Sequence, residues 1–216
     1  MESITLERVL PDVFAECAEA HSGSDVWLSE LSFRRGGRYL VQAASGAGKS
    51  SLCAFIYGFR QDYTGRILFN STDIRSITPS GWDAARQRVI AWLPQDMRLF
   101  PTLTALENIM LKVSLTHFKT EAEVMAMLEE VGMERFADRP ARLLSIGQQQ
   151  RVAAVRAVCQ PFAFLLLDEP VSHLDDVSNR AVSSLIEAEA SRQGAAIITT
   201  SVGNNPYITQ EITLSL

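Results

Sequence analysis

Two glycines, a lysine and two serines stand together where a buried strand is expected to end. The segment reads Ala44-Ser45-Gly46-Ala47-Gly48-Lys49-Ser50-Ser51 and follows an apolar run. Gly46 and Gly48 carry no Cβ, so the backbone can wrap closely around an anion, and its successive N–H groups form an anion-binding nest. A helix that begins near Lys49 adds the positive end of its dipole. The spacing predicts a nucleotide phosphate site in which Lys49 reaches the β- and γ-phosphates and Ser50 ligates Mg²⁺.

Ala43 stands where this phosphate-loop pattern has its first glycine. An alanine is tolerated there if the position needs only a negative φ and no very close approach. We therefore expect a slightly altered entry to the loop and no loss of binding. The alternative for the whole segment is a flexible strand-to-helix turn with a surface lysine.

A second candidate lies about 120 residues downstream, where the apolar run at 164–167 ends in Asp168 and Glu169. Ligands of open α/β sheets gather at the carboxyl ends of the strands. Asp168 is thus expected beside the phosphate loop, where it can hold Mg²⁺, and Glu169 is suited to orient and deprotonate an attacking water. An isolated acidic pair would instead indicate a solvated turn, but its pairing with the phosphate loop favours the nucleotide site.

The segment at 144–151 carries a third pattern, Leu-Ser-Ile-Gly-Gln-Gln-Gln-Arg. Ser145 and Gln148 have the spacing of a capping box, with Ser145 as N-cap. The helix that follows, with Val152, Val155 and Val158 on one stripe, would expose free N–H groups at its start. These groups form an anion site aimed away from the chain's own phosphate loop. A well-capped amphipathic helix without any ligand is the alternative.

This third pattern resembles the Leu-Ser-Gly-Gly-Gln signature of ATP-binding cassette (ABC) ATPases. Gln95 resembles the family's glutamine loop, and Ser172-His173-Leu174-Asp175 resembles its D-loop. The resemblance follows the family's motif order over most of the chain. The pieces at 64–69 and 103–109 are similar to the short, single-cassette bacterial importer and lipoprotein-release or cell-division type.

The resemblance implies ATP and Mg²⁺ as cofactors, with Glu169 and Gln95 catalytic and Mg²⁺ held by Ser50, Gln95 and Asp168. It implies that two cassettes, identical or different, pair head to tail on ATP binding. Each signature then closes on the γ-phosphate of the other, and the residues concerned are Ser145, Ile146, Gly147 and Gln148. It further implies an integral membrane permease whose coupling helix docks near Gln95 and the segment at 96–101. Met97, Leu99 and Phe100 form a short apolar cluster there that could equally pack onto the helical subdomain.

Two further departures from the family pattern bear on turnover. Ile146 replaces the first signature glycine. A branched side chain does not readily take a positive φ and adds bulk near the phosphate, so Ile146 is expected to weaken dimer closure. The family's switch histidine is missing, because Ser201 or, by register, Val202 occupies its place. His173 is interpreted as a D-loop contact residue and not as its replacement. Loss of such a positioning contact costs roughly 10²-fold in rate, so slow hydrolysis is expected.

The residue that would stack on adenine is left open between Phe14, His21 and Trp27, although Trp27 fits core packing better. The surrounding pattern is that of an α/β protein, since continuous apolar runs alternate with helical patterns. Strands are predicted at 38–43, 66–69, 89–93, 162–167 and 195–200, and helices at 49–57, 120–131, 147–158 and 177–192.

We expect a P-loop NTPase fold with a mainly parallel sheet core, an inserted α-helical subdomain and an antiparallel β edge at the N-terminus. Residues 1–96 and 156–216 form the sheet core and about 97–155 the helical subdomain. The last ten residues are predicted to add antiparallel strands at an edge.

Composition narrows the function classes. The 216 residues are 47% hydrophobic with a net charge of −5, which supports a large core and argues against a broad nucleic-acid surface. Three scattered cysteines support neither a disulfide framework nor a zinc site. No secretion signal or membrane span is predicted, so a cytoplasmic location, peripheral on the inner face of the cell membrane, is expected.

The leading hypothesis is the ATP-binding and ATP-hydrolysing subunit of an ABC transporter, slow in isolation. The alternative is a nucleotide-gated clamp with little or no turnover, favoured by Ile146 and the missing histidine. An ABC-type ATPase that acts on DNA or ribosomes is disfavoured by the acidic balance. A phosphate-loop kinase would leave the segment at 145–151 unexplained.

Overall fold

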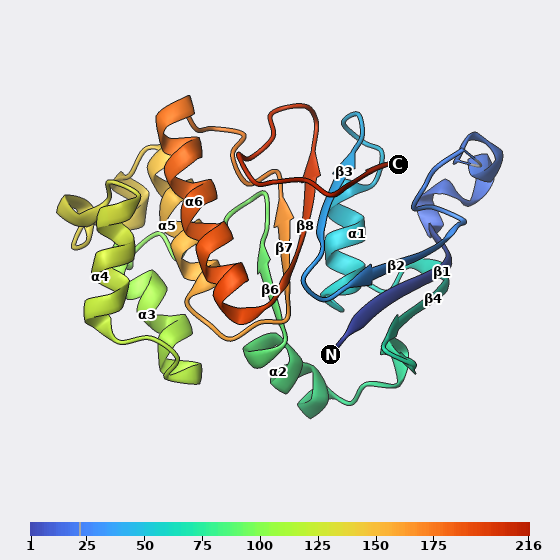
Figure 1. Cartoon of the computed structure of the whole chain (residues 1–216), viewed down its shortest axis with the longest axis horizontal. Helices are drawn as coiled ribbons and strands as arrows, with labels where there is room; N and C mark the ends of the chain where they lie inside the picture. Colours follow the sequence, from blue (N-terminus) through green and yellow to red (C-terminus); the bar gives the residue numbers. More distant parts are fainter. Residues whose placement is uncertain (22) are drawn as a thin grey trace.

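A computed structural model of the chain describes residues 1–21 and 23–216, with the backbone alone at residue 20. Figure 1 shows three regions side by side: a helical region, a central sheet and a second sheet that carries the N-terminus.

The central sheet is parallel throughout, with strand order β6-β7-β8-β3-β9. Its strands are β3 (Arg38–Gln42), β6 (Ile90–Leu93), β7 (Phe164–Asp168), β8 (Ala196–Ser201) and β9 (Ile212–Ser215). Every residue of β7 and β8 is buried. This burial explains why the sequence runs there are continuously apolar and not alternating.

Two of the strand predictions need correction. The C-terminal strand β9 pairs with β3 in parallel and not antiparallel, because the chain returns after β8 along a long irregular segment before it enters the edge. The run at 66–69 belongs to β4 (Tyr63–Phe69) of the second sheet and not to the parallel core. Its glycine and arginine at 65 and 66 remain partly or fully exposed, as expected for a strand with one wet face.

The second sheet has the order β2-β1-β4-β5, and its pairs are antiparallel. It contains β1 (Ser3–Pro11), β2 (Glu30–Arg34) and β5 (Thr72–Asp73) in addition to β4. Two short 3₁₀ segments flank it, η1 (Asp12–His21) and η2 (Ile74–Ser76). The predicted antiparallel edge at the N-terminus is therefore confirmed.

Helix α1 (Lys49–Ile56) lies between the two sheets (Figure 1), and α2 (Pro79–Arg88) precedes β6. The helical region contains α3 (Ala105–Thr116), α4 (Glu121–Glu130), η3 (Glu134–Phe136), η4 (Ala141–Leu143) and the start of α5 (Ile146–Val158), while α6 (Asp176–Gln193) packs on α5. The stretch at 97–155 thus contains helices and no strand among its residues.

Side chains of the central sheet alternate between two hydrophobic cores. Leu165, Leu167 and Ile197 face the helical region, together with the valine stripe of α5. Phe164, Leu166 and Ile198 face α1 and the second sheet. The sheet is therefore the shared wall that places the start of α1 and the start of α5 on one rigid frame. In the described residues, no helix combines the length and the apolar character that a membrane span requires.

Candidate functional site

The phosphate loop connects β3 to α1 as the sequence predicted. Gly48 is the N-cap of α1 with φ 94°, and Gly46 has φ 84°, both in the left-handed region that favours glycine. A Cβ on Gly48 would lie 3.0 Å from the Trp27 ring and 3.2 Å from the Phe14 ring. Ala43 is absent from the residues with positive φ, which is the condition under which an alanine is tolerated at the first position of the loop.

Lys49 is buried at the centre of this loop. Its ammonium group donates to the carbonyl oxygens of Ala43 at 3.1 Å and Ala44 at 2.8 Å, and it lies 3.6 Å from Glu169 Oε1. The side chain is therefore held over the loop, where it faces the carboxylate that follows β7.

The structure brings the second candidate to the same edge. Asp168 ends β7, and Glu169 follows with φ 51°, a strained backbone for a residue with a Cβ. Gln95, two residues beyond β6, donates from Nε2 to Glu169 Oε2 at 3.2 Å. A cavity of about 220 Å³ is lined by the loop residues Ser45 to Ser51, other than Ala47, together with Gln95 and Glu169.

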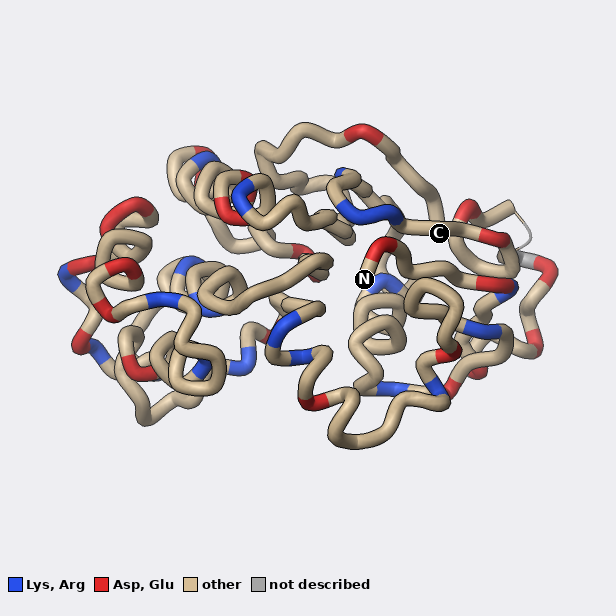
Figure 2. Tube along the Cα trace, turned by 60° about the horizontal axis from the view of Figure 1, so that its bottom comes forward, with Lys and Arg blue, Asp and Glu red and all other residues tan. Residues whose placement is uncertain are grey.

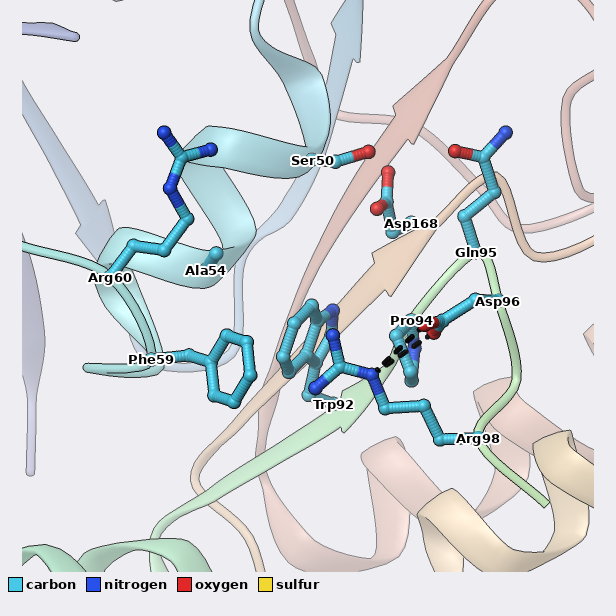
Figure 3. Close-up of a pocket in the computed structure, with 10 residues that line it drawn as sticks. All are labelled: Ser50, Ala54, Phe59, Arg60, Trp92, Pro94, Gln95, Asp96, Arg98 and Asp168. Carbon is cyan, nitrogen blue, oxygen red and sulfur yellow. Dashed lines mark hydrogen bonds and ion pairs between the residues drawn. The ribbon is translucent and has the colours of Figure 1, made fainter. Parts of the chain in front are cut away.

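Asp168 lies deeper, only 2% exposed, and its Oδ1 accepts a hydrogen bond of 2.8 Å from Thr200 Oγ1. In Figure 3 the side chains of Ser50, Gln95 and Asp168 point toward a common space, and all three line one cavity of about 290 Å³. A hydroxyl, an amide oxygen and a carboxylate are hard oxygen ligands that fit Mg²⁺. In the described part of the chain, no group of three or more His, Cys, Asp or Glu side chains is arranged so that it could hold a metal ion.

Asp168 also affects its neighbour under α1. Burial, with the Asp168 charge as a second cause, raises the pKa of the Cys53 thiol well above its usual range. Cys53 therefore stays a neutral packing residue next to the site.

Gln150 holds the turn around Glu169, a role that the sequence analysis missed. Its Nε2 donates to the Glu169 carbonyl oxygen at 3.1 Å and to Ser172 Oγ at 3.3 Å, and its Oε1 accepts from the His173 N–H at 3.0 Å. The signal was present, because Gln150 is a polar residue on a stripe otherwise made of Ala153, Ala154 and Ala157.

The signature segment forms the predicted capping box. Gln148 N donates to Ser145 Oγ at 3.3 Å, and Ser145 N donates to Gln148 Oε1 at 2.9 Å. The expectation that Ile146 disturbs a position of positive φ is wrong, because Ile146 opens α5 and is absent from the positive-φ residues. Its side chain is 51% exposed. The position that requires glycine is Gly147, where a Cβ would lie 2.9 Å from the His173 carbonyl oxygen.

The D-loop residues lie between Glu169 and α6. Ser172 Oγ and His173 Nδ1 are 3.0 Å apart. Asp175 is the N-cap of α6 and accepts from Ser178 N at 2.8 Å; this backbone hydrogen bond lowers the pKa of Asp175. His173 therefore contacts its neighbours in the loop and does not reach the Glu169 carboxylate by any hydrogen bond of the described residues.

The switch position lies at the end of β8. Ser201 is the buried last residue of the strand, and its Oγ accepts from Gly203 N at 2.9 Å and donates to the Asn204 carbonyl at 3.1 Å. Val202, just beyond, is 52% exposed. Ser201 is thus a structural turn residue, while Val202 leaves room for a larger side chain.

The three aromatic candidates for the adenine differ in burial. Trp27 is 1% exposed and donates from Nε1 to the Ala47 carbonyl at 3.1 Å, so it packs behind the phosphate loop as expected. Phe14 and His21 stack on each other in η1 with ring centroids 4.4 Å apart. Phe14 and His21 are partly exposed, whereas Trp27 is buried, so the Phe14–His21 pair is the more accessible stacking surface.

Comparisons with known proteins agree with this geometry. The profile of the ABC transporter family matches residues 29–172. The lipoprotein-releasing system ATP-binding protein LolD of Syntrophotalea carbinolica is 35% identical over 161 residues, which is 73% of this chain and 70% of LolD. The ABC transporter ATP-binding protein YtrE of Bacillus subtilis is 32% identical over 171 residues, 78% of this chain and 74% of YtrE. The chain spans 55% of a third relative, the hypophosphite import protein HtxD of Stutzerimonas stutzeri.

Solved structures share the fold. The bacterial ABC transporter cassette MJ0796, solved as a dimer, superposes with a TM-score of 0.80 at 22% identity, covering 98% of this chain and 94% of that chain. The same cassette in a post-hydrolysis state with ADP and phosphate gives 0.76 at 22% identity over 92% of this chain and 87% of that chain.

Proposed function

The chain belongs to the ABC transporter family, and from this premise we propose that it is a nucleotide-hydrolysing subunit that drives a membrane permease by ATP-dependent dimerisation. The observation that carries the proposal is the convergence of three distant segments. Lys49, Gln95 and Glu169 meet within hydrogen-bond or ion-pair distance at one sheet edge. Parallel strands bring their carboxyl ends to that edge, so the arrangement follows from the topology.

In this proposal the backbone N–H groups of the phosphate loop and the Lys49 ammonium bind the phosphates of ATP. Glu169 accepts the proton of the attacking water, and Gln95, which already contacts that carboxylate, orients the water. Mg²⁺ fits the oxygens of Ser50, Gln95 and Asp168, and when bound it neutralises charge that develops on the phosphates. The adenine stacks on the exposed side of the Phe14–His21 pair.

The second cassette, a copy of this chain or a different one, completes the site. The start of α5 presents Ser145, Ile146, Gly147 and Gln148 at a capped helix N-terminus that is exposed or partly exposed. These residues would bind the γ-phosphate held by the partner. Gln150 of the same helix holds the turn of Glu169. A movement of α5 on closure over the partner's nucleotide would therefore also move Glu169 in the chain's own site.

We place the permease in a hollow between the sheet and the helical region, called the junction groove. It has a volume of about 310 Å³ and is lined by Trp92, Pro94 and Arg98 on one side and by Leu111, Lys112 and Arg156 on the other, among other residues. Trp92, Pro94 and Arg98 also line the cavity that holds Ser50, Gln95 and Asp168. An occupant of the groove therefore touches the loop that carries Gln95. The subunit would then work peripherally at the inner face of the cell membrane.

The apolar residues after Gln95 have two different roles, packing onto the helical region and contact with a partner. Met97 is buried in the helical core and Leu99 packs against it, whereas Phe100 is 56% exposed at the groove. Packing of the loop thus accounts for the first two residues, and a partner contact remains for the third.

The competing function is a nucleotide-gated clamp, favoured by the absence of a histidine at 201 and 202. Steady-state phosphate release separates the two functions. We expect the chain to release phosphate at least 10²-fold faster than a Glu169→Gln variant, because the variant lacks the general base. Equal rates, with ATP binding intact in both proteins, would favour the clamp.

A further inference from the structure

The junction groove is basic as well as apolar. Three cationic side chains line it, Arg98, Lys112 and Arg156, and no Asp or Glu of the described residues does so. Figure 2 shows blue segments gathered where the helical region meets the sheet core. A ligand of this groove therefore meets a lining with more positive than negative side chains.

Two of the three cations already have partners. Arg98 binds Asp96 at 3.1 Å and stacks on Phe59 and Trp92, with its guanidinium carbon 4.4 and 5.0 Å from the ring centroids (Figure 3). Arg156 donates to the carbonyl oxygens of Met97 and Arg98, and thereby fixes the loop that follows Gln95. Both arginines are therefore held in place by the loop.

Lys112 differs from these two arginines. In the part of the chain that the structure describes, its ammonium group forms no hydrogen bond and no ion pair. Burial, followed by the charges of Arg156 and Arg86, lowers the pKa of Lys112 to about 8. The protein thus keeps a partly buried cation among other cations, an arrangement that an external anion would relieve.

The surroundings of Lys112 indicate what carries that anion. Leu111 and Leu115 on α3 are 43% and 54% exposed, and with Phe100 they form an apolar rim beside Lys112. Leu111 and Leu115 are one helical turn apart, the spacing at which ridges of one helix pack against another. An amphipathic helix with one acidic residue matches both the apolar rim and the charge.

We propose that the permease segment that occupies the junction groove is a helix carrying a carboxylate that pairs with Lys112. This inference rests on the proposed function and adds the chemistry by which the partner is recognised. The carboxylate sits between Lys112 and Arg156, and apolar side chains on the same face contact Leu111, Leu115 and Phe100. The pair forms in a partly dry groove, so it contributes to specificity as well as to affinity.

The chain has three lysines, at 49, 112 and 119, which makes Lys112 accessible to a direct test. Reductive ¹³C-methylation of this 216-residue chain yields three lysine side-chain signals for NMR. The probes are three synthetic amphipathic helical peptides, identical except for Glu, Gln or Lys at the central polar position. Affinities are measured with the wild-type chain, with Lys112→Gln, and with the control Arg34→Gln, which alters an exposed cation on β2.

We expect the Glu peptide to bind at least about 10-fold more tightly than the Gln peptide, to shift the Lys112 signal and to raise its pKa. Lys112→Gln should abolish this preference and Arg34→Gln should retain it. Equal binding of the Glu and Gln peptides, no binding of any peptide, or an unmoved Lys112 signal would overturn the inference. A Lys112 shift on concentrating the protein alone would assign the groove to a second copy of this chain, which also overturns it. If Glu169→Gln still dimerises with ATP, any of these results leaves the proposed function intact.

Discussion

At the scale of single residues, the backbone of Glu169, the proposed general base, is the feature from which the first prediction starts. A non-glycine residue at φ 51° is strained, by an amount of order 1–3 kcal/mol. Three groups of the turn, the Glu169 carbonyl, Ser172 Oγ and the His173 N–H, are bound by the single side chain of Gln150. Gln150 is therefore a positioning residue for Glu169, and its effect should appear in turnover before it appears in nucleotide binding.

We predict that Gln150→Leu lowers kcat by about 10- to 100-fold with little change in the affinity for ATP, because misplacement of a catalytic group costs rate. The free energy of unfolding should fall by about 1–3 kcal/mol, since buried polar groups lose their partner. Phosphate release measures kcat, and titration with ATP measures the affinity. The matched control is Gln149→Leu, which removes a bond to the Leu144 carbonyl on the same helix. A similar loss of kcat in both variants would contradict the positioning role.

The switch position offers a gain-of-function prediction. Val202 is half exposed, whereas Ser201 is buried and closes the turn through Gly203 and Asn204. Val202→His should raise phosphate release, up to roughly 10²-fold, because a positioning contact to the γ-phosphate is restored. Ser201→His should destabilise the protein instead, since it places a large polar ring in a buried strand end. Unchanged turnover in a folded Val202→His protein would show that the switch is not at this register.

At the scale of elements, α5 connects two sites. Its first turn carries the signature and its second turn holds Glu169 through Gln150. Ile146 is helical and exposed, so it contributes little to the stability of the fold. Its bulk would instead hinder the approach of a partner surface.

We therefore predict that Ile146→Gly lowers the free energy of unfolding by only about 0.5 kcal/mol, the helix-propensity difference, and strengthens ATP-dependent dimerisation. Sedimentation of Glu169→Gln with and without Ile146→Gly, in the presence of ATP, compares the two proteins. Weaker association of the double variant would mean that the isoleucine contributes a favourable contact across the dimer.

The elements that follow from local pattern were predictable from the sequence. Continuous apolar runs gave β3, β6, β7 and β8, and the capping box gave the start of α5, because each depends on neighbours within one turn or one strand. The parallel direction of β9 was not predictable, since its polarity is set by the path of the preceding irregular segment. Helix α2 was also missed, because its sequence is largely polar and only Trp82 is buried.

The candidate site shows the same division. The phosphate loop and the two acids were predicted because spacing and strand polarity bring them together. The sequence did not predict that Gln150 holds the Glu169 turn, that Thr200 bonds Asp168, or that Lys112 has no partner among the described residues. Each of these depends on contacts between segments far apart in the chain. The sequence predicts which residue types lie at the carboxyl edge of the sheet. Only the fold shows which of their groups form hydrogen bonds or ion pairs with one another.

At the scale of the whole molecule, Lys112 lies between the helical region and the sheet. Its pKa in the folded protein, about 8, lies below the ordinary value of 10.5. Between pH 8 and 10.5 the unfolded chain binds more protons than the folded one, so stability rises with pH across this window. Below pH 8 the charged lysine costs the fold stability at the junction.

Lys112→Met should accordingly raise the free energy of unfolding at pH 7, by about 2 kcal/mol. The difference from the wild-type chain should shrink as pH rises from 8 to 10.5. Urea denaturation at several pH values measures it, with Arg34→Met as an exposed control. If the difference in unfolding free energy between Lys112→Met and the wild-type chain stays constant with pH, the effect comes from packing of the methionine and not from the lost charge.

The most direct measurement for the whole account is the molar mass of Glu169→Gln in solution with ATP and Mg²⁺, determined by light scattering after gel filtration. Glu169 lies 3.6 Å from Lys49 and bonds Gln95. As it is the proposed general base, we expect that replacing its carboxylate blocks hydrolysis while the phosphate loop stays intact. We predict a shift from monomer to dimer with ATP and Mg²⁺, no shift with ADP, and none when Lys49→Ala is added. A variant that binds ATP but remains monomeric, or one that gives no thermal shift with ATP, would contradict the account.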